Sequence, residues 1–274
     1  MRCNLPKRLL RLPLLIFAIA CGSALPARGQ LPFYTDDADT TDKGKFHFEF
    51  FDEQDLLQRV LYPAKRQNTA NFTLNYGLTK RVELDVNFPI LTIYNAKTSP
   101  LGNPTGIGDT QFGVKYRFHD ERENSKIPAL AAVFYIEVPT GNTRLQLGSG
   151  VTDYWLYGVA QKSLTRKMTG RLNGGILFAG NTSTGLVGIQ TTRGQVFTAN
   201  GSVTREFTSR LRLGAELFGA VTNNFALSKG QLEAQIGGNY ALSKQFSLAF
   251  GILGGHFSAS PRAGALIGFA YDFK

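Results

Sequence analysis

The chain of 274 residues is poor in the side chains that most often carry chemistry, with two cysteines, three histidines, two methionines and one tryptophan. Two thiols are too few for a cysteine-rich zinc site, and three histidines leave little room for another metal centre. The serine-hydrolase elbow Gly-x-Ser-x-Gly, the zinc motif His-Glu-x-x-His and the phosphate-binding P-loop are all missing. We therefore expect a protein that is not an enzyme and that holds neither a metal nor a cofactor.

Long apolar runs are also missing. After residue 30 no stretch reaches the 18 consecutive apolar residues of a membrane-spanning helix. No long stretch repeats apolar residues at the i, i+3, i+4 and i+7 positions of an amphipathic helix either. The absence of both helical patterns leaves an all-β chain as the expected fold class.

Residues 1–29 have the three parts of a secretory signal peptide. A basic start is followed by an apolar run at 12–20, and the small residues Ala27 and Gly29 precede the expected cleavage site. Lipoprotein processing at Cys21 is an alternative, because the residues before it form a degenerate lipobox. Cleavage after Gly29 removes both cysteines and lowers the net charge from +10 to about +5, which leaves no reason to expect nucleic-acid binding.

From residue 45 onward apolar and polar residues alternate with the period of two that is typical of β-strands. In residues 81–88, for example, the even positions from Val82 to Phe88 are apolar and the odd positions from Arg81 to Asn87 are polar. The pattern predicts twelve strands of about 9–11 residues, the length that a tilted strand needs to cross a bilayer. They are expected at 45–53, 67–76, 81–90, 108–118, 128–138, 152–162, 169–179, 195–206, 211–220, 231–241, 246–254 and 263–273.

The links between the predicted strands are of two kinds. Four even-numbered links are short turns with a shared pattern, an apolar residue, then a hydroxyl residue, then mostly basic or polar ones (78–81, 164–167, 207–210 and 242–245). Links after odd-numbered strands are mostly longer and rich in Gly, Asn, Ser, Thr and Pro. This asymmetry is typical of a transmembrane, antiparallel, up-and-down β-barrel of the outer-membrane type, with periplasmic turns and extracellular loops.

Such a barrel suits lipid because closure satisfies every backbone N–H and C=O group without water. A soluble secreted β-sandwich is the alternative, since its strands alternate too, but strands joined by short turns favour a meander over a Greek key. In the barrel, the apolar faces point outward and aromatic residues gather near the membrane interfaces. The aromatic residues expected there are Phe46, Phe50, Tyr76, Phe88, Tyr116, Phe118, Tyr154, Phe178, Phe197, Tyr240, Phe246, Phe269, Tyr271 and Phe273.

Three segments carry a family resemblance. They are LPFYTDDADTTDKGKFHFEF at 31–50, GIGDTQFGVKYRF at 106–118, and VPTGN at 138–142 followed by TDYWLYGVAQKSL at 152–164. In this order they resemble the outer-membrane proteins labelled "putative MetA-pathway of phenol degradation" proteins, or transporters. The resemblance implies an outer-membrane barrel that passes aromatic or other apolar molecules. One departure is Lys274, since barrels commonly end on an aromatic residue that the assembly machinery reads.

Alternation assigns thirteen charged residues to the barrel interior, five basic and eight acidic. Unpaired ions in a narrow lumen are costly, so we expect the two signs to pair across neighbouring strands. They could then pack the interior of a small barrel or line a selective pore. The lumen-lining candidates are Glu49, Arg81, Glu83, Asp85, Asp109, Lys115, Arg117, Glu137, Asp153, Arg171, Arg212, Glu216 and Glu233.

The inward face of the last two predicted strands is small and uncharged. The lumen is therefore expected to have one charged wall and one small, apolar wall, which suits an amphipathic or aromatic solute. The residues of the small wall are Ser247, Ala249, Gly251, Leu253, Gly264, Leu266, Gly268 and Ala270.

An acidic run precedes the first strand and contains Asp36, Asp37, Asp39 and Asp42. It allows three interpretations. The segment could be a polar periplasmic lead-in, or it could fold into the lumen as a plug whose carboxylates meet lumen arginines. It could also bind calcium, although it lacks the Asp-x-Asp-x-Asp-Gly loop and its distant glutamate.

We therefore expect a signal peptide at 1–29, a polar segment at 30–44 and a barrel at 45–274. The first functional hypothesis is an outer-membrane channel for passive uptake of small solutes. The alternatives are a structural barrel with a closed lumen and a barrel enzyme that acts on lipid. The enzyme would need a serine and a histidine together, and His256 and Ser258 fall in an expected solvated loop. The expected partners are outer-membrane lipid, lipopolysaccharide, the barrel-assembly machinery and a small-molecule solute, and no nucleic acid.

Overall fold

The computed structural model describes residues 31–123, 125–179, 194–222 and 230–274. The predicted signal peptide at 1–29 lies outside the described residues. So does most of the two predicted extracellular loops at 180–194 and 221–230. The described residues include no helix with the length and hydropathy of a transmembrane span.

Strands make up most of the described chain. Two single-turn helices, η1 (Arg59–Leu61) and η2 (Thr143–Leu145), lie in links between them. The strands are β1 (Phe46–Leu56), β2 (Ala64–Gly77), β3 (Val82–Asn95), β4 (Thr105–Ile107), β5 (Thr110–His119), β6 (Ala129–Val138), β7 (Asp153–Thr165), β8 (Met168–Ala179), β9 (Gly194–Glu206), β10 (Leu211–Thr222), β11 (Gln231–Ala241), β12 (Phe246–His256) and β13 (Ala263–Phe273).

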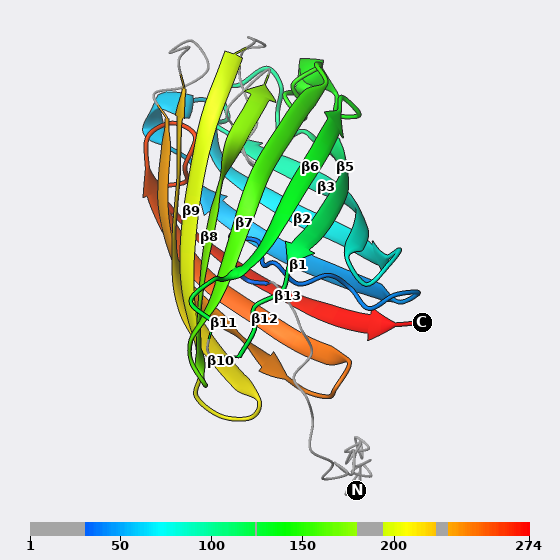
Figure 1. Cartoon of the computed structure of the whole chain (residues 1–274). Helices are drawn as coiled ribbons and strands as arrows, with labels where there is room; N and C mark the ends of the chain where they lie inside the picture. Colours follow the sequence, from blue (N-terminus) through cyan, green and yellow to red (C-terminus); the bar gives the residue numbers. More distant parts are fainter. Residues whose placement is uncertain (1–30, 124, 180–193, 223–229) are drawn as a thin grey trace, which may run out of the picture.

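The long strands form one closed antiparallel sheet. Each pairs with its neighbours along the chain, and β13 pairs with β1, so that the red and blue ribbons lie side by side in Figure 1. The short β4 adds to the edge of β3 in the link between β3 and β5. The predicted all-β, up-and-down barrel of twelve long strands is therefore confirmed. The largest difference is β3, which continues to Asn95, five residues past the predicted end at residue 90.

The outer face of the barrel is apolar and the inner face is polar, which reverses the usual arrangement of a protein in water. Near mid-strand, the outward side chains of Leu172, Ile236, Ile252 and Ile267 are 64–66% exposed. Inward neighbours such as Gln235, one residue from Ile236, are buried. An exposed apolar belt around a closed sheet is the surface that hydrocarbon requires.

Aromatic residues gather at the end of the barrel where the short turns lie, which is the lower right-hand end in Figure 1 and includes the C-terminus. Phe46 at the start of β1 packs on Tyr76 of β2, with ring centroids 4.8 Å apart, and on Phe273 of β13, at 5.4 Å. Phe246 and Phe269 continue the row at 5.5 Å. Aromatic rings at this height match the girdle that outer-membrane barrels place at a membrane interface.

The repeated turn pattern has a hydrogen-bonding cause. Thr79 Oγ1 accepts hydrogen bonds from the backbone N–H groups of Arg81 and Val82, at 3.1 and 3.0 Å. Thr208 and Ser243 do the same for the second and third residues after them. The hydroxyl thus satisfies two N–H groups that the tight reversal leaves without a strand partner.

Replacing Thr208 by valine should therefore weaken the barrel, because it leaves the N–H groups of Arg210 and Leu211 without their acceptor. The expected loss is about 1 kcal/mol of unfolding free energy, the usual net value of one such bond. Urea titration of the barrel in detergent micelles, read by its altered gel mobility without boiling, measures the change. Ser209→Ala in the same turn is the matched control, and an equal loss in both variants would contradict the role given to the Thr208 hydroxyl.

Candidate transport lumen

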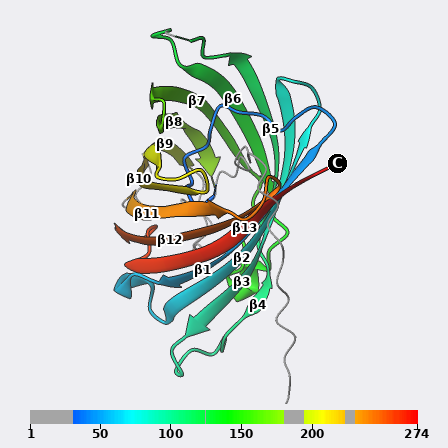
Figure 2. The ribbon, with the colours of Figure 1, turned by 90° about the horizontal axis from the view of Figure 1, so that it is seen from below.

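Residues 31–42, which we call the inner segment, precede β1, and all but the end of the segment lies inside the barrel. Figure 2 shows this segment, in blue, crossing the opening of the barrel seen from below. Its side chains are largely hidden: Leu31 and Phe33 are 6% and 5% exposed, and Thr35 and Ala38 are fully buried. The segment therefore fills part of the lumen of the barrel.

The first part of the inner segment is held by β10 and β11. Gln235 donates from Nε2 to the carbonyl of Pro32 at 2.6 Å, and Asn239 donates from Nδ2 to that of Leu31 at 3.2 Å. The carboxylate of Glu216 accepts from the backbone N–H of Tyr34 at 3.0 Å and also from that of Thr35. Polar side chains of the wall thus replace a strand partner for this irregular backbone, as buried peptide groups require.

Asp36 is the central contact of the inner segment. Its backbone N–H donates to Oδ1 of Asn173 at 2.6 Å, and Asn173 Nδ2 donates back to its carbonyl at 3.1 Å. Its carboxylate accepts from Lys115 Nζ at 2.7 Å and from the Tyr157 hydroxyl at 2.9 Å. One residue is thereby tied to β5, β7 and β8.

Lys115 is the main cation at this level and is 3% exposed. Besides Asp36, its Nζ lies 3.3 Å from Glu83 Oε1 and 3.8 Å from Asp37 Oδ1. Glu83 also accepts a hydrogen bond from the backbone N–H of Thr41. The ammonium group offsets part of the cost of burying the three carboxylates around it.

The arginines of the lumen meet the remaining carboxylates of the inner segment. Arg117 Nη1 lies 3.0 Å from Asp39 Oδ1, and Gln161 Nε2 donates to Asp39 Oδ2 at 3.0 Å. Arg171 Nη2 reaches Asp37 Oδ2 at 4.0 Å. Asp42 differs, since its side chain is 70% exposed and pairs with Lys45 at 2.8 Å outside the lumen; of the four plug candidates, Asp42 is therefore not an interior residue.

The inner segment leaves the lumen over Gly77 at the end of β2. A β-carbon at this position would lie 2.2 Å from the carbonyl oxygen of Asp42 and 2.4 Å from that of Thr41. Only glycine lets the two backbones come so close. The N–H of Gly44 donates to the Gly77 carbonyl at 2.7 Å, which fixes the exit.

Burial raises the pKa values of two groups in the inner segment. It raises the pKa of the Tyr34 hydroxyl well above its ordinary value, and the carboxylates of Glu53, Glu233 and Asp55 raise it further. The hydroxyl therefore stays protonated and donates to Glu53. Burial also raises the pKa of the Asp37 carboxyl to about 6, although Lys115 opposes the shift.

Most of the charged residues assigned to the interior by alternation are buried there. Four others, Asp109, Arg117, Glu137 and Arg212, are half-buried. The buried ones, all 2–7% exposed, are Glu49, Glu83, Asp85, Lys115, Asp153, Arg171, Glu216 and Glu233.

Arg81 is a correction to the interior set. It precedes β3, in the turn after β2, and its side chain is 55% exposed and 3.6 Å from Asp120. Alternation does not fix the direction of a side chain in a turn, because the backbone there is not extended. Arg81 therefore belongs to the outer edge of the turn region and does not line the lumen.

Asp109 has a structural partner in a loop. Its two carboxylate oxygens accept from the backbone N–H groups of Gly141 and Ser149, at 2.9 and 2.6 Å. The link between β6 and β7 is thereby folded inward, so that Leu147 is 1% exposed and packs on Leu91 and Ile93 of β3. This link covers part of the lumen at the loop end.

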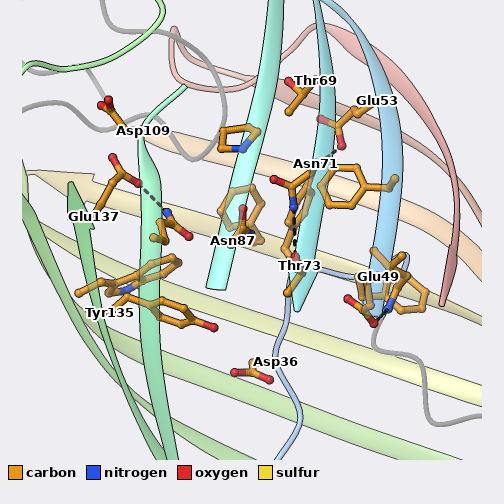
Figure 3. A pocket seen from close by; sticks show the side chains of 18 of the residues that line it. Asp36, Glu49, Glu53, Thr69, Asn71, Thr73, Asn87, Asp109, Tyr135 and Glu137 are labelled. Carbon is orange, nitrogen blue, oxygen red and sulfur yellow. Dashed lines mark hydrogen bonds between the residues drawn. The ribbon is translucent and has the colours of Figure 1, made fainter. Parts of the chain in front are cut away.

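A cavity of about 270 Å³ lies between the inner segment and the folded link. Figure 3 shows Glu53, Asn71 and Glu137 among the side chains that point into it from different strands. Six carboxylates line it, together with Lys115 as its one basic side chain among the described residues. Its acidic residues are Asp36, Glu49, Glu53, Asp109, Glu137 and Asp153, and its aromatic residues are Phe33, Tyr34, Phe51, Tyr135, Trp155, Tyr157 and Phe218.

Sequence reasoning missed several of these residues. Asp55 lies beyond the strand end predicted at residue 53 and faces inward because β1 continues to Leu56, whereas Glu53 lies within the predicted strand and shares the inward parity of Glu49. Tyr135 and Trp155 share the inward parity of Glu137 and Asp153, so alternation would have found them had it been applied to rings as well as charges. Aromatic residues were expected only on the lipid face.

The small residues of β12 and β13 lie on the buried face of the barrel. Ala249 and Ala270 are each 1% exposed, and Leu253 and Leu266 are each 5% exposed. The apolar start of the inner segment also needs a small residue in the wall, because a β-carbon at Gly237 of β11 would lie 2.8 Å from the ring of Pro32. The lumen thus has a charged side around Lys115 and a small, apolar side.

The three histidines lie in different parts of the barrel. His47 lies between Asp272 and Glu49, with ring nitrogens at 2.6 and 3.0 Å from their carboxylates. His119 contacts the carbonyl of Pro128 at 2.9 Å, and His256 ends β12 and was expected in a loop. Among the described residues no group of three His, Cys, Asp or Glu side chains could hold a metal ion.

Solved structures share this fold at low identity. An outer membrane channel from Pseudomonas putida F1 is similar with a TM-score of 0.66 and 16% identity, covering 86% of this chain and 98% of its own. The NanC porin follows with 0.57 and 10%, covering 82% and 98%. The translocator domain of the autotransporter NalP from Neisseria meningitidis has 0.51 and 11%, covering 83% and 87%. No curated protein matches the chain.

The three structures are named as an outer membrane channel, a porin and the translocator domain of an autotransporter. At these identities they establish the fold and leave the cargo open. A closed barrel of this fold with an apolar outer face is a protein of the cell outer membrane. Residues 35–273 match the profile of the family described as "Putative MetA-pathway of phenol degradation", to which the chain therefore belongs, as the three segments near its start and middle predicted.

Proposed function

We propose that the protein is a passive channel through which small amphipathic or aromatic solutes cross the outer membrane. The observation that carries the proposal is the cavity inside the closed barrel, whose lining mixes carboxylates, amides and aromatic rings. A purely structural barrel would gain little from such a lining, because buried ions cost several kcal/mol each before they are paired. The family description, which names phenol degradation, supports an aromatic solute.

The inner segment restricts this channel. Its contacts with the wall are mainly hydrogen bonds and ion pairs, made to Glu216, Asn173, Lys115 and Glu83. Apolar contacts are fewer and are made by its first residues and by Ala38, which packs against β6 and β7. Polar contacts of this kind can be exchanged for water one by one, whereas an apolar core cannot. Solutes therefore pass when part of the segment leaves its position.

The channel needs no catalytic chemistry. Both ring nitrogens of His47 are engaged by carboxylates, and the ring of His256 packs against Phe257 at 4.6 Å. We propose that the partners are outer-membrane lipid and lipopolysaccharide at the outer face, the barrel-assembly machinery during insertion, and the solute in the lumen.

Two measurements test the proposal. Purified protein in a planar bilayer should give discrete conductance steps, and vesicles that contain it should swell in an iso-osmotic solution of 2-phenylethanol faster than protein-free vesicles. A barrel with a permanently closed lumen is the competing function, favoured by the buried inner segment. It predicts a heat-modifiable barrel band on a gel, no conductance, and swelling no faster than that of protein-free vesicles, and that result would refute the channel.

A further inference from the structure

The interior wall formed by β5, β6 and β7 is layered, and the layers follow from the strand register. Gln111, Glu137 and Asp153 lie opposite one another across the three strands and form the layer nearest the long loops. Gln111 Nε2 donates to Glu137 at 2.6 Å. Two carboxylates on neighbouring strands thus face the same side of the cavity.

The next layer toward the turns is aromatic. Tyr135 and Trp155 are register partners one step below Glu137 and Asp153, and Tyr157 follows on β7. The Trp155 and Tyr157 ring centroids lie 4.9 Å apart, and Tyr135 stacks on Tyr157 at 6.4 Å. Gly113 makes the room, since a β-carbon there would lie 2.2 Å from the Tyr135 ring.

The charge of the cavity lining is one-sided. Six of its side chains are carboxylates, and Lys115, its one basic residue among those described, already faces Asp36, Glu83 and Asp37. The buried polar atoms of the cavity lining that have no hydrogen-bond partner among the described residues are acceptors. The amide oxygens of Asn75 and Asn200, in side chains at most 9% exposed, line the cavity and have no hydrogen-bond partner among the described residues.

We propose that this wall is a binding site for small organic cations, in which an ammonium group lies at the carboxylates of Glu137 and Asp153 and an aromatic or aliphatic body lies on Tyr135, Trp155 and Tyr157. Carboxylates attract the charge, and aromatic faces attract both the cation and the apolar body. The acceptor oxygens of Asn75 on β2 and Asn200 on β9 line the same cavity and favour a solute that carries hydrogen-bond donors. The inference rests on the proposed channel and assigns its solute class.

Trp155 makes the site directly observable, because it is the single tryptophan of the chain. Its fluorescence is titrated with three probes of similar size: 2-phenylethylamine, which is cationic, 2-phenylethanol, which is neutral, and phenylacetate, which is anionic. The amine should give a saturable change with a Kd about tenfold or more below that of the alcohol, and phenylacetate should give none. Equal affinity for amine and alcohol would overturn the assignment.

Two variants locate the charge recognition. Glu137→Gln keeps an acceptor for Gln111 and should raise the Kd for the amine about tenfold while leaving that for the alcohol unchanged. Glu206→Gln is the matched control, since Glu206 pairs with Arg212 at the turn end of the barrel, far along the strands from this wall. An amine Kd that Glu137→Gln leaves unchanged would place the cation elsewhere and refute the site.

Conductance is measured on the same preparations. Conducting protein that does not distinguish amine from alcohol would refute the cation site and leave the proposed channel standing. Selective amine binding by a barrel that never conducts would refute the channel and support the site. Each protein is first checked for its heat-dependent gel shift, so that a misfolded variant is not scored.

Discussion

Replacing Ile236 by arginine should prevent much of the protein from folding into lipid vesicles. Ile236 lies at the middle of β11, on the outer face, and is 64% exposed; its register partner on β12, Ile252, is 65% exposed. If this face meets hydrocarbon, an arginine near the bilayer midplane costs about 2–4 kcal/mol. The fraction of protein with the mobility of the folded barrel on an unboiled gel, measured at increasing urea, gives the loss.

Leu242→Arg is the matched control for the effect of depth. Leu242 lies in the turn between β11 and β12 and is 49% exposed. The same kind of substitution near an interface should cost about 0–1 kcal/mol. A soluble barrel predicts that neither arginine matters, since both positions would face water. Equal, small effects at both positions would therefore contradict the conclusion that this face contacts lipid.

The path of the wall could be predicted from the sequence because its determinants are local. A strand that faces lipid on one side and the lumen on the other must alternate apolar and polar residues. Residues 81–88 show this pattern without interruption. The hydroxyl turns are local too, since Thr79 binds N–H groups two and three residues away. The closing pair of β1 with β13 then follows from the even number of long strands.

The contents of the lumen could not be predicted in the same way. The contact of Tyr34 with Glu216 joins residues 182 positions apart, and no periodicity records it. The acidic run is compatible with a periplasmic lead-in as much as with the observed position, because solvent and the individual cations of the lumen, Lys115, Arg117 and Arg171, both accept carboxylates. The position of the segment depends on Lys115 of β5, whose ammonium group pairs with Asp36 inside the barrel.

Arg81 and Tyr135 show where alternation predicts the direction of a side chain and where it does not. Arg81 has the inward parity of β3 but lies one residue before the strand, where parity no longer fixes the side chain. Tyr135 has the inward parity of β6 and does face the lumen, with its hydroxyl 3.2 Å from Asp85. Parity is therefore reliable within a paired strand and uninformative at its ends, whatever the type of side chain.

Replacing Lys115 by methionine should release the inner segment and open the channel. The variant keeps the length of the side chain but leaves the carboxylates of Asp36 and Glu83 buried without their common cation. Removing one partner of a buried ion pair costs about 3–5 kcal/mol. The equilibrium between docked and released segment should shift by about a hundredfold or more, and open events in a planar bilayer should become correspondingly longer or more frequent.

A cysteine reporter follows the segment independently of conductance. Ala38 is fully buried in the inner segment, and the chain expected after cleavage at Gly29 has no other thiol. In an Ala38→Cys background, Lys115→Met should increase the rate of modification by a water-soluble maleimide by about the same hundredfold factor. The control is Lys162→Met, which removes an ion pair with Glu121 outside the inner segment.

The two readouts separate docking from restriction. Faster modification together with longer openings means that the inner segment limits the pore and that Lys115 holds it in place. Faster modification with unchanged conductance would mean that the segment docks without limiting flow, so the constriction would have to lie at the link folded inward by Asp109. Unchanged modification would show that Glu216 and Asn173 hold the segment without Lys115, because their bonds to its backbone remain intact in the variant.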